Sequence, residues 1–392
     1  MLDTISHRYI TLAFDLEQHV AGFVDAYFGP PELKAHAGLR PPADIAADIA
    51  TLRAEVAASA YPASRKGYLE VQLRAIACTA RRLAGEPISF SDEVRECFDV
   101  APLFTPETTF EAANAELETL LPGAGPLAER LTVWRRRYEV DTATARQMID
   151  VIAVEARRRT AALVDLPDSD EVRFALVRDK PWSGYNWYLG DGRSLVEVNT
   201  DLPIRADSLL DLVCHEAYPG HHTEHALKEQ LLYRGQGWGE QAIQLINTPE
   251  CVIAEGIATL AATMIFGAEL HTWAAEHIYP LAGITGDPER EQRITLAQRS
   301  LRALNGNAAT LLHERGADPE EVVRYLMRYG LRSEREARQS LRFISTPLWR
   351  SYSFTYFVGR QILGAWLARG DQHTRFRRLL TEQVYPSMLA EG

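Results

Sequence analysis

Four of the eleven histidines of this 392-residue chain lie in one short segment, at positions 215 to 225. The segment reads Cys214-His215-Glu216-Ala217-Tyr218-Pro219-Gly220-His221-His222. An apolar run at positions 209–213 precedes it, so we expect the cluster to begin on a buried helix. Imidazoles buried beside a carboxylate need partners, and a metal ion satisfies several of them together. The segment predicts a zinc (Zn²⁺) site for hydrolysis; the alternative is a polar network in the core.

The spacing differs from the common zinc motif H-E-x-x-H, in which two histidines share one helix face and the glutamate is the general base. His221 follows His215 by six residues, which rotates it roughly 120° away on an ideal helix. His222 is nearly in line but about 10 Å along the axis, too far for bonds of about 2 Å to one zinc. An undistorted helix therefore cannot form the site.

Pro219 and Gly220 are the residues that distort the helix. The proline ring clashes with the carbonyl four residues earlier, which is that of His215, and proline donates no backbone hydrogen bond. Gly220 tolerates almost any backbone angles, so the pair predicts a break or bulge. Looping out two residues returns His221 to the place of the second histidine in the common motif. This argument favours His221 as the second ligand, with His222 as the alternative.

A third candidate ligand lies on a predicted helix that begins at Thr248 and Pro249. Glu255 follows within an apolar stretch, where an unpaired carboxylate is costly. A metal provides a partner for it, and a salt bridge is the alternative. With His215 and His221 it would supply three protein ligands and leave one position open, which is the arrangement of catalytic zinc.

The motif His-Glu-Ala-x-Pro-Gly-His-His resembles the signature of a bacterial domain family of unknown function that is similar to the gluzincin metallopeptidases. More distant similarity is to carboxypeptidase Taq and the thimet-type oligopeptidases. Two further segments fit the resemblance, Glu255-Gly256-Ile257-Ala258 and Tyr356-Phe357-Val358-Gly359-Arg360. Ile257 stands where the family has tryptophan. The resemblance implies a mainly α fold with a small antiparallel sheet and helical lobes around an active-site cleft.

The segment at 356–360 offers groups that suit peptide hydrolysis. Tyr356 and Arg360 are four residues apart and share a helix face. A tyrosine hydroxyl can stabilise an oxyanion, and an arginine can bind a substrate carboxylate. The resemblance favours Tyr356 for the first role, and Tyr352 is the competing residue.

These residues predict a metallopeptidase that cleaves short peptides. Zinc held by His215, His221 and Glu255 would lower the pKa of a water to about 7. Glu216 would take its proton and deliver it to the leaving amine, and Tyr356 would stabilise the oxyanion. Hydrolysis of a non-peptide amide or ester, and metal binding without turnover, are the alternatives. The intact Glu216 speaks against the last, because a structural zinc site needs a fourth ligand and no base.

Residues 171–199 are expected to position these groups through short strands at 172–177, 185–189 and 194–198, with a hairpin turn at Gly190-Asp191-Gly192-Arg193. The edge of such a sheet can bind an extended peptide by strand addition. The aromatic residues Trp182, Tyr185, Trp187 and Tyr188 either line that cleft or pack within the sheet.

The rest of the chain predicts helices. Residues 1–170 form an N-terminal helical lobe and 171–392 the catalytic region, with breaks at the proline-rich sites near 30, 41, 102–106 and 122–126. A net charge of −11 argues against a nucleic-acid partner. No signal-peptide core is evident and no run approaches a membrane span, so we expect a soluble, cytoplasmic protein that binds no membrane. The oligomeric state is not predicted.

Overall fold

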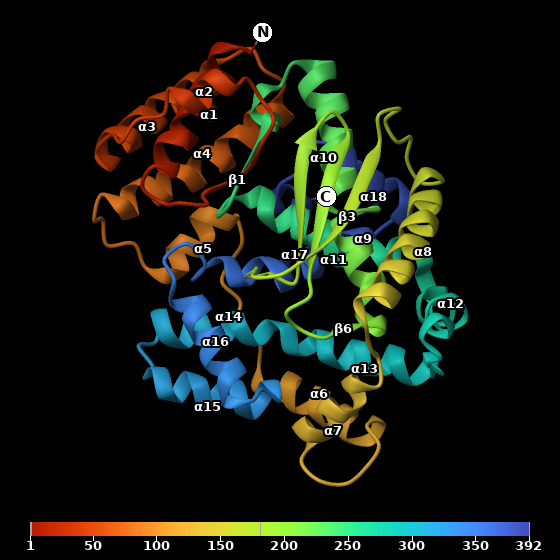
Figure 1. Ribbon diagram of the computed structural model, residues 1–392. Coiled ribbons are helices and arrows are strands. Elements are labelled where there is room, and N and C mark those ends of the chain that lie inside the picture. The colour runs from red at the N-terminus through yellow and green to blue at the C-terminus, as the bar shows by residue number, and fades with distance from the viewer. Residues whose placement is uncertain (1, 181, 392) are drawn as a thin grey trace.

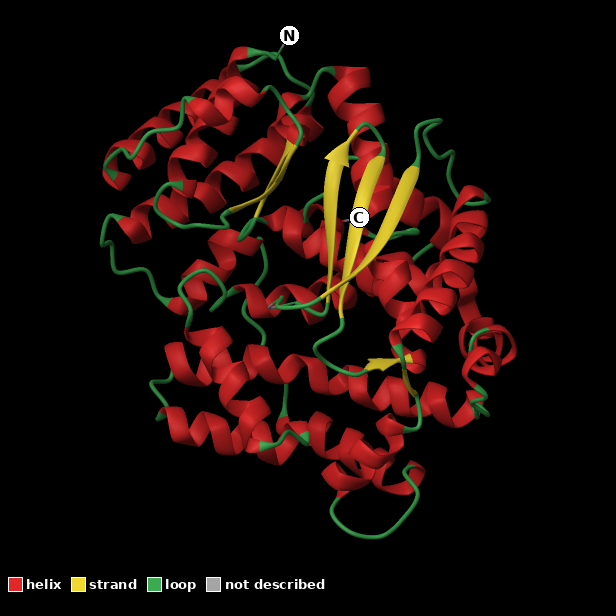
Figure 2. Cartoon of the chain, in the orientation of Figure 1, coloured by secondary structure: helices red, strands yellow, loops and turns green. Residues whose placement is uncertain are grey.

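The structure, a computed structural model, describes residues 2–180 and 182–391, apart from the side chains of Tyr356 and Glu391. Within these ranges the chain is mainly helical with small sheets, which confirms the predicted mainly α class (Figure 2). Residues on both sides of position 170 contribute to one large core.

In the N-terminal part, α2, α3, α6 and α7 begin at the predicted proline-rich breaks. Prolines start α2 and α3 and precede α4, α6 and α7, because a proline at a helix start loses no hydrogen bond that the helix would make. The helices are α1 (Thr4–Glu17), α2 (Pro31–Ala35), α3 (Pro42–Ala58), α4 (Ala63–Leu83), α5 (Phe90–Phe98), α6 (Glu107–Leu120), α7 (Leu127–Arg136) and α8 (Thr142–Ala161). In Figure 1, α1 to α4 lie at one end of the molecule and α6 and α7 at the other.

The three predicted strands form one sheet, but it is mixed rather than antiparallel. The strands are β3 (Glu171–Val177), β4 (Gly184–Gly190) and β5 (Arg193–Asn199), in the order β3-β5-β4. The turn between β4 and β5 has positive φ at Asp191 (57°) and Gly192 (67°), as a tight hairpin requires. The chain runs from β3 at one edge of the sheet to β4 at the other edge and returns between them as β5. β5 is therefore antiparallel to β4 and parallel to β3, which corrects the expectation of an antiparallel sheet.

Two shorter pairings tie distant segments together. β1 (Val24–Tyr27) pairs with β7 (Ile243–Leu245), and β2 (Glu139–Val140) pairs with β6 (Ile204–Arg205), both antiparallel. β1 also lies beside β4, so the N-terminal part contributes one wall next to the edge of the mixed sheet.

The remaining elements are helical and follow the sheet in sequence. They are α9 (Ala206–Glu216), α10 (His221–Lys228), η1 (Glu229–Arg234), η2 (Gly239–Ala242), α11 (Pro249–Phe266), η3 (Gly267–Glu269), α12 (Leu270–His277), η4 (Tyr279–Ala282), α13 (Pro288–Ser300), η5 (Leu301–Ala303), α14 (Leu304–His313), α15 (Pro319–Gly330), α16 (Glu334–Ser345), η6 (Tyr352–Phe354), α17 (Thr355–Leu367), α18 (Gln372–Thr381) and α19 (Pro386–Glu391). As predicted, Thr248 is the N-cap of α11 and Pro249 its first residue.

Helix α11 is the central element of this half. It packs against both α9 and α17. Gly256 on α11 faces Gly359 on α17, and a Cβ at Gly256 would lie 2.9 Å from the Gly359 carbonyl, so the two backbones touch. The segment Pro249–Ala282 is long and apolar enough to cross a membrane, contrary to the sequence expectation, although 67% of its most apolar window is buried inside the protein.

Candidate metal centre

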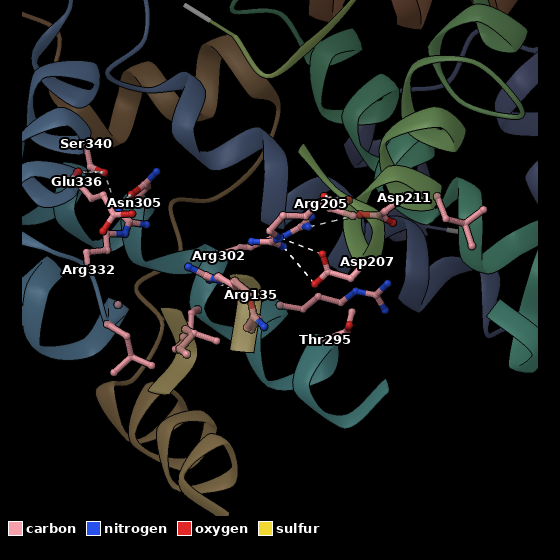
Figure 3. A pocket seen from close by; sticks show the side chains of 18 of the residues that line it. Arg135, Arg205, Asp207, Asp211, Thr295, Arg302, Asn305, Arg332, Glu336 and Ser340 are labelled. Atoms are coloured by element: carbon pink, nitrogen blue, oxygen red, sulfur yellow. Dashed lines mark hydrogen bonds and ion pairs between the residues drawn. The ribbon is translucent and has the colours of Figure 1, made fainter. Parts of the chain in front are cut away.

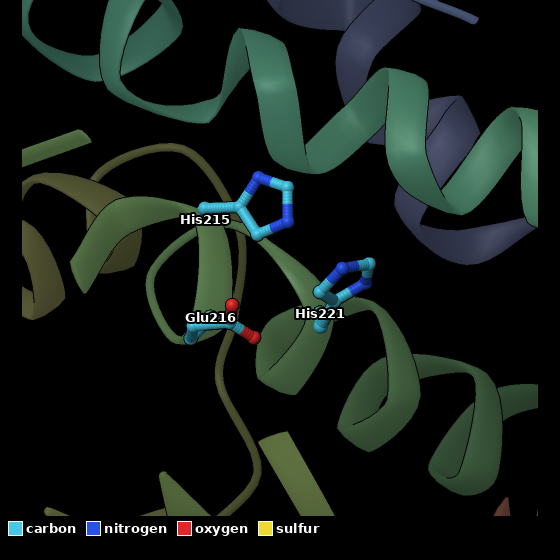
Figure 4. A group of neighbouring side chains, drawn as sticks. All are labelled: His215, Glu216 and His221. Carbon is cyan, nitrogen blue, oxygen red and sulfur yellow. The ribbon is translucent and has the colours of Figure 1, made fainter. Parts of the chain in front are cut away.

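The histidine motif lies on two helices with a sharp break between them, as Pro219 and Gly220 predicted. α9 ends at Glu216 and α10 begins at His221. At Gly220 a Cβ would lie 1.8 Å from the carbonyl oxygen of His215, so only glycine fits this turn. The break brings the rings of His215 and His221 to a centroid separation of 4.8 Å (Figure 4).

Glu255 reaches this pair of histidines from the neighbouring helix α11. Its Oε2 lies 3.6 Å from Nε2 of His215, and its Oε1 lies 3.9 Å from Nε2 of His221. Oε2 is buried and has no hydrogen-bond partner among the described residues, whereas Oε1 accepts a hydrogen bond of 3.1 Å from the Tyr352 hydroxyl. Glu255 thus lies beside both imidazoles, with its unsatisfied Oε2 nearer to His215 and its hydrogen-bonded Oε1 nearer to His221. Imidazole nitrogens and a carboxylate oxygen are ligands that suit a divalent metal.

Glu216 completes the group from the last residue of α9. The ligand atoms of His215, Glu216 and His221 all lie within 4.8 Å of one another. Asn186 on β4 donates a hydrogen bond of 2.7 Å to the Glu216 carbonyl, which ties the end of α9 to the sheet edge. The side chain is buried, with 8% of its surface exposed. Two carboxylates therefore lie near the histidines, that of Glu255 from α11 and that of Glu216 from α9.

Burial sets the protonation of these groups before any metal binds. It lowers the pKa of His215 to about 4, and the charge of Arg302 adds to the effect. It also lowers the pKa of His221 well below the ordinary value, so both imidazoles are neutral, as metal ligation requires. Burial raises the pKa of Glu255 to about 8, and burial together with the nearby Glu255 raises that of Glu216 to about 8. A bound cation would offset the cost of ionising these carboxyl groups.

These pKa values predict that zinc binding releases protons and tightens as pH rises. Glu255 must be ionised to bind a metal, and below its pKa of about 8 it is mostly protonated. Affinity should rise by up to about tenfold for each pH unit between about pH 6 and 8. Calorimetric titration of the metal-free protein in buffers of different ionisation enthalpy measures both effects. A pH-independent affinity without proton release would contradict ligation by Glu255.

The structure places His222 away from this group. Its Nδ1 lies 2.8 Å from Ser194 Oγ and its Nε2 lies 2.7 Å from Asp170 Oδ1. The side chain is fully buried, and both nitrogens are engaged. Asp170 also accepts hydrogen bonds from Arg157 and Tyr218, so His222 belongs to a network that holds α10 against the start of β3.

The other predicted residues lie on or near η6 and α17. Tyr352 contacts Glu255 through the hydrogen bond already described. The side chain of Tyr356 lies outside the described residues. Arg360 donates a hydrogen bond to the Thr259 carbonyl on α11, and burial lowers its pKa to about 10.

Sequence reasoning missed Asp25, which lies on β1 near the metal-binding group. The Tyr185 hydroxyl donates a hydrogen bond to its carboxylate, and burial raises its pKa. The charge of Asp25 in turn raises the pKa of both Glu216 and Glu255. No motif marks Asp25, because it comes near the metal-binding group only through the packing of β1 beside β4.

Some of the four aromatic residues near β4 line a cavity, and others pack within the protein. The rings of Trp182, Tyr185 and Trp187 form a cluster with centroid separations of 4.6 to 6.0 Å, and Trp187 is 37% exposed. Tyr188 is buried and donates a hydrogen bond to Glu229. A cavity of about 650 Å³ lies between β1 and β4 and is lined by Asn186 and Trp187.

No family model matches the chain, and no curated protein matches it. The crystal structure of a "putative lipoprotein" from Colwellia psychrerythraea is similar, with a TM-score of 0.52, 16% identity, and coverage of 87% of this chain and 64% of that chain. A "putative lipoprotein of unknown function" from Shewanella oneidensis has a TM-score of 0.51 at 12% identity, covering 92% of this chain and 74% of that chain. This chain thus spans less than two-thirds of the Colwellia protein, and the likeness shows the fold alone.

Proposed function

We propose that this chain is a zinc-dependent hydrolase that cleaves short peptides at a gluzincin-like active site. The observation that carries the proposal is the proximity of Glu255 to His215 and His221, where, within the described part of the chain, the buried Glu255 Oε2 accepts no hydrogen bond. A ligand set of two histidines and one carboxylate leaves a position open for a reacting molecule. A polar network alone would satisfy that oxygen, because a buried orphan acceptor costs stability.

When bound there, zinc would polarise the substrate carbonyl and lower the pKa of a water molecule to about 7. Glu216 is placed to take the proton of the attacking water and to deliver it to the leaving amine. Tyr352 orients Glu255 through its hydrogen bond to Oε1. Tyr356 remains the candidate for stabilising the oxyanion, on the resemblance alone.

The cavity between β1 and β4 is proposed to hold the peptide. β4 is an edge strand of its sheet, so its free backbone groups can pair with an extended chain. Asn186 lines this cavity and also bonds the backbone of Glu216, which connects the groove to the general base. An extended peptide along β4 would therefore pass beside Glu216, whereas a folded protein would not enter the groove.

Metal content and a substrate panel test this proposal directly. Elemental mass spectrometry of the purified, untagged protein should find about one zinc per chain. The zinc-loaded protein should then cleave members of a panel of short peptides, and chelation should stop the cleavage. Small amides and esters in the same panel separate a peptidase from another hydrolase. Absence of zinc binding, even when zinc is offered, would overturn the proposal.

A further inference from the structure

A second cavity, of about 670 Å³, lies along α9 and is rich in arginine (Figure 3). Its lining includes five arginines, Arg135, Arg205, Arg299, Arg302 and Arg332, and three acidic residues, Asp207, Asp211 and Glu336. The arginines come from several different elements that the fold brings together. The chain as a whole has a net charge of −11, so this excess of positive charge is a local exception.

Two carboxylates on α9 each pair with an arginine of this cavity, Asp207 with Arg205 and Asp211 with Arg302. Arg302 Nη2 lies 3.6 Å from Asp211 Oδ2. Arg299 and Arg360 are also attracted to Asp211, and Arg302 repels both of them. Arg302 is thus the arginine that pairs with Asp211, and Arg299 lines the same cavity. Among the described residues, the side chain of Arg299 makes no hydrogen bond or ion pair. A half-buried guanidinium group without a partner beside an exposed one favours an additional anion.

This cluster adjoins the candidate metal centre. Asp211 precedes His215 by four residues on α9, so the two side chains share a face and are about 6 Å apart along the axis. The charge of Arg302 also acts on both His215 and Glu255. An extended peptide advances about 3.3–3.6 Å per residue. A group bound beside Asp211 is therefore about one or two residues from a bond held at the metal centre.

We propose that Arg299 and Arg302 bind a carboxylate of the substrate, which makes the enzyme selective for peptides that carry this group on one side of the scissile bond. The inference rests on the proposed function for its substrate class. The carboxylate can be the C-terminus of the peptide or the side chain of an aspartate or glutamate. Both present the planar pair of oxygens that a guanidinium binds through two hydrogen bonds.

Peptide binding to the metal-free chain of residues 1–392 tests the inference without turnover. The probes are tri-alanine with an acetylated N-terminus and a free carboxylate, its C-terminal amide, and an amide-capped peptide in which glutamate replaces the last alanine. We expect at least one of the two charged peptides to bind at least tenfold more tightly than the neutral amide. Which charged peptide is preferred identifies the terminus or the side chain as the source. Equal binding of all three, or no detectable binding, would overturn the inference.

Variants test whether Arg299 and Arg302 cause the preference for peptides that carry a carboxylate. Arg299→Gln/Arg302→Gln should abolish it, while Arg95→Gln/Arg324→Gln, which removes the same charge at exposed positions outside the cavity, should leave it unchanged. Asp211→Asn should tighten carboxylate binding several-fold, a gain that partial unfolding cannot produce. A preference that survives in the first variant would overturn the inference. Carboxylate selectivity without hydrolysis of any peptide would instead count against the proposed function alone.

Discussion

Replacing Glu216 by glutamine should leave zinc in place and remove most of the turnover. Glutamine keeps the size of the side chain but cannot accept the proton of the attacking water. The loss of a positioned general base lowers the rate by about 10²- to 10⁴-fold. Because Glu216, the last residue of α9, is not among the three groups proposed to hold the metal, zinc content should be unchanged. The measurements are kcat on a peptide that the wild type cleaves and zinc per chain by elemental mass spectrometry.

Glu276→Gln is the matched control for this substitution. Glu276 is exposed on α12, so it loses the same charge outside the metal-binding group. Its kcat should equal that of the wild type. A fully active Glu216→Gln protein would refute the assigned role of the general base. Loss of zinc in that variant would instead make Glu216 a ligand, an arrangement that its distance from His215 and His221 also permits.

Replacing His221 by alanine should cost more than 100-fold in zinc affinity. Loss of a group that only supports a ligand already costs about 10- to 100-fold, and His221 is proposed to bind the metal itself. The imidazole lies 3.9 Å from Glu255 and is neutral, so it is available for ligation. The fold should persist, because its removal leaves Glu255 Oε2 as unsatisfied as before. Competition with a zinc chelator of known affinity measures the change.

His222→Ala is the comparison at the adjacent residue, and it should lower the stability of the fold while leaving zinc binding unchanged. Its two nitrogens bond Ser194 and Asp170, so the substitution removes two buried hydrogen bonds, although Ser194 keeps its bond to Asn186 and Asp170 those from Arg157 and Tyr218. A hydrogen bond contributes about 0.5–1.5 kcal/mol, or about 1.5–3 kcal/mol when one partner is charged, and this loss should appear as a lower midpoint of thermal unfolding. Zinc should remain at about one per chain. Zinc lost from the His222 variant and retained in the His221 variant would exchange the two assignments.

The local features of the site follow from sequence because they depend on neighbouring residues. Pro219 and Gly220 break the helix through their own backbone chemistry, and the resulting turn brings His221 beside His215. The hairpin of β4 and β5 likewise depends on positive φ angles at Asp191 and Gly192. The helices that start at prolines are also predictable from sequence, because each start depends only on the proline and its immediate neighbours.

The contacts between distant elements could be read only from the tertiary structure. Spacing alone left His221 and His222 as alternatives, and the packing of α10 against Asp170 and Ser194 distinguishes them. The parallel pairing of β3 depends on β5 returning between β3 and β4, for which no local signal exists. The same applies to Asp25, whose charge reaches Glu216 from a strand early in the chain.

The sequence by itself therefore determined the types of residue at the site, the break that positions two of them, and the mainly helical class. The tertiary structure decided which carboxylates face the histidines and which arginines gather around Asp211. The physical reason is that backbone chemistry acts over a few residues. The partners of a buried charge are instead set by how whole helices and strands pack, and Arg299, Arg302 and Arg360 carry no mark of that packing in their local sequence.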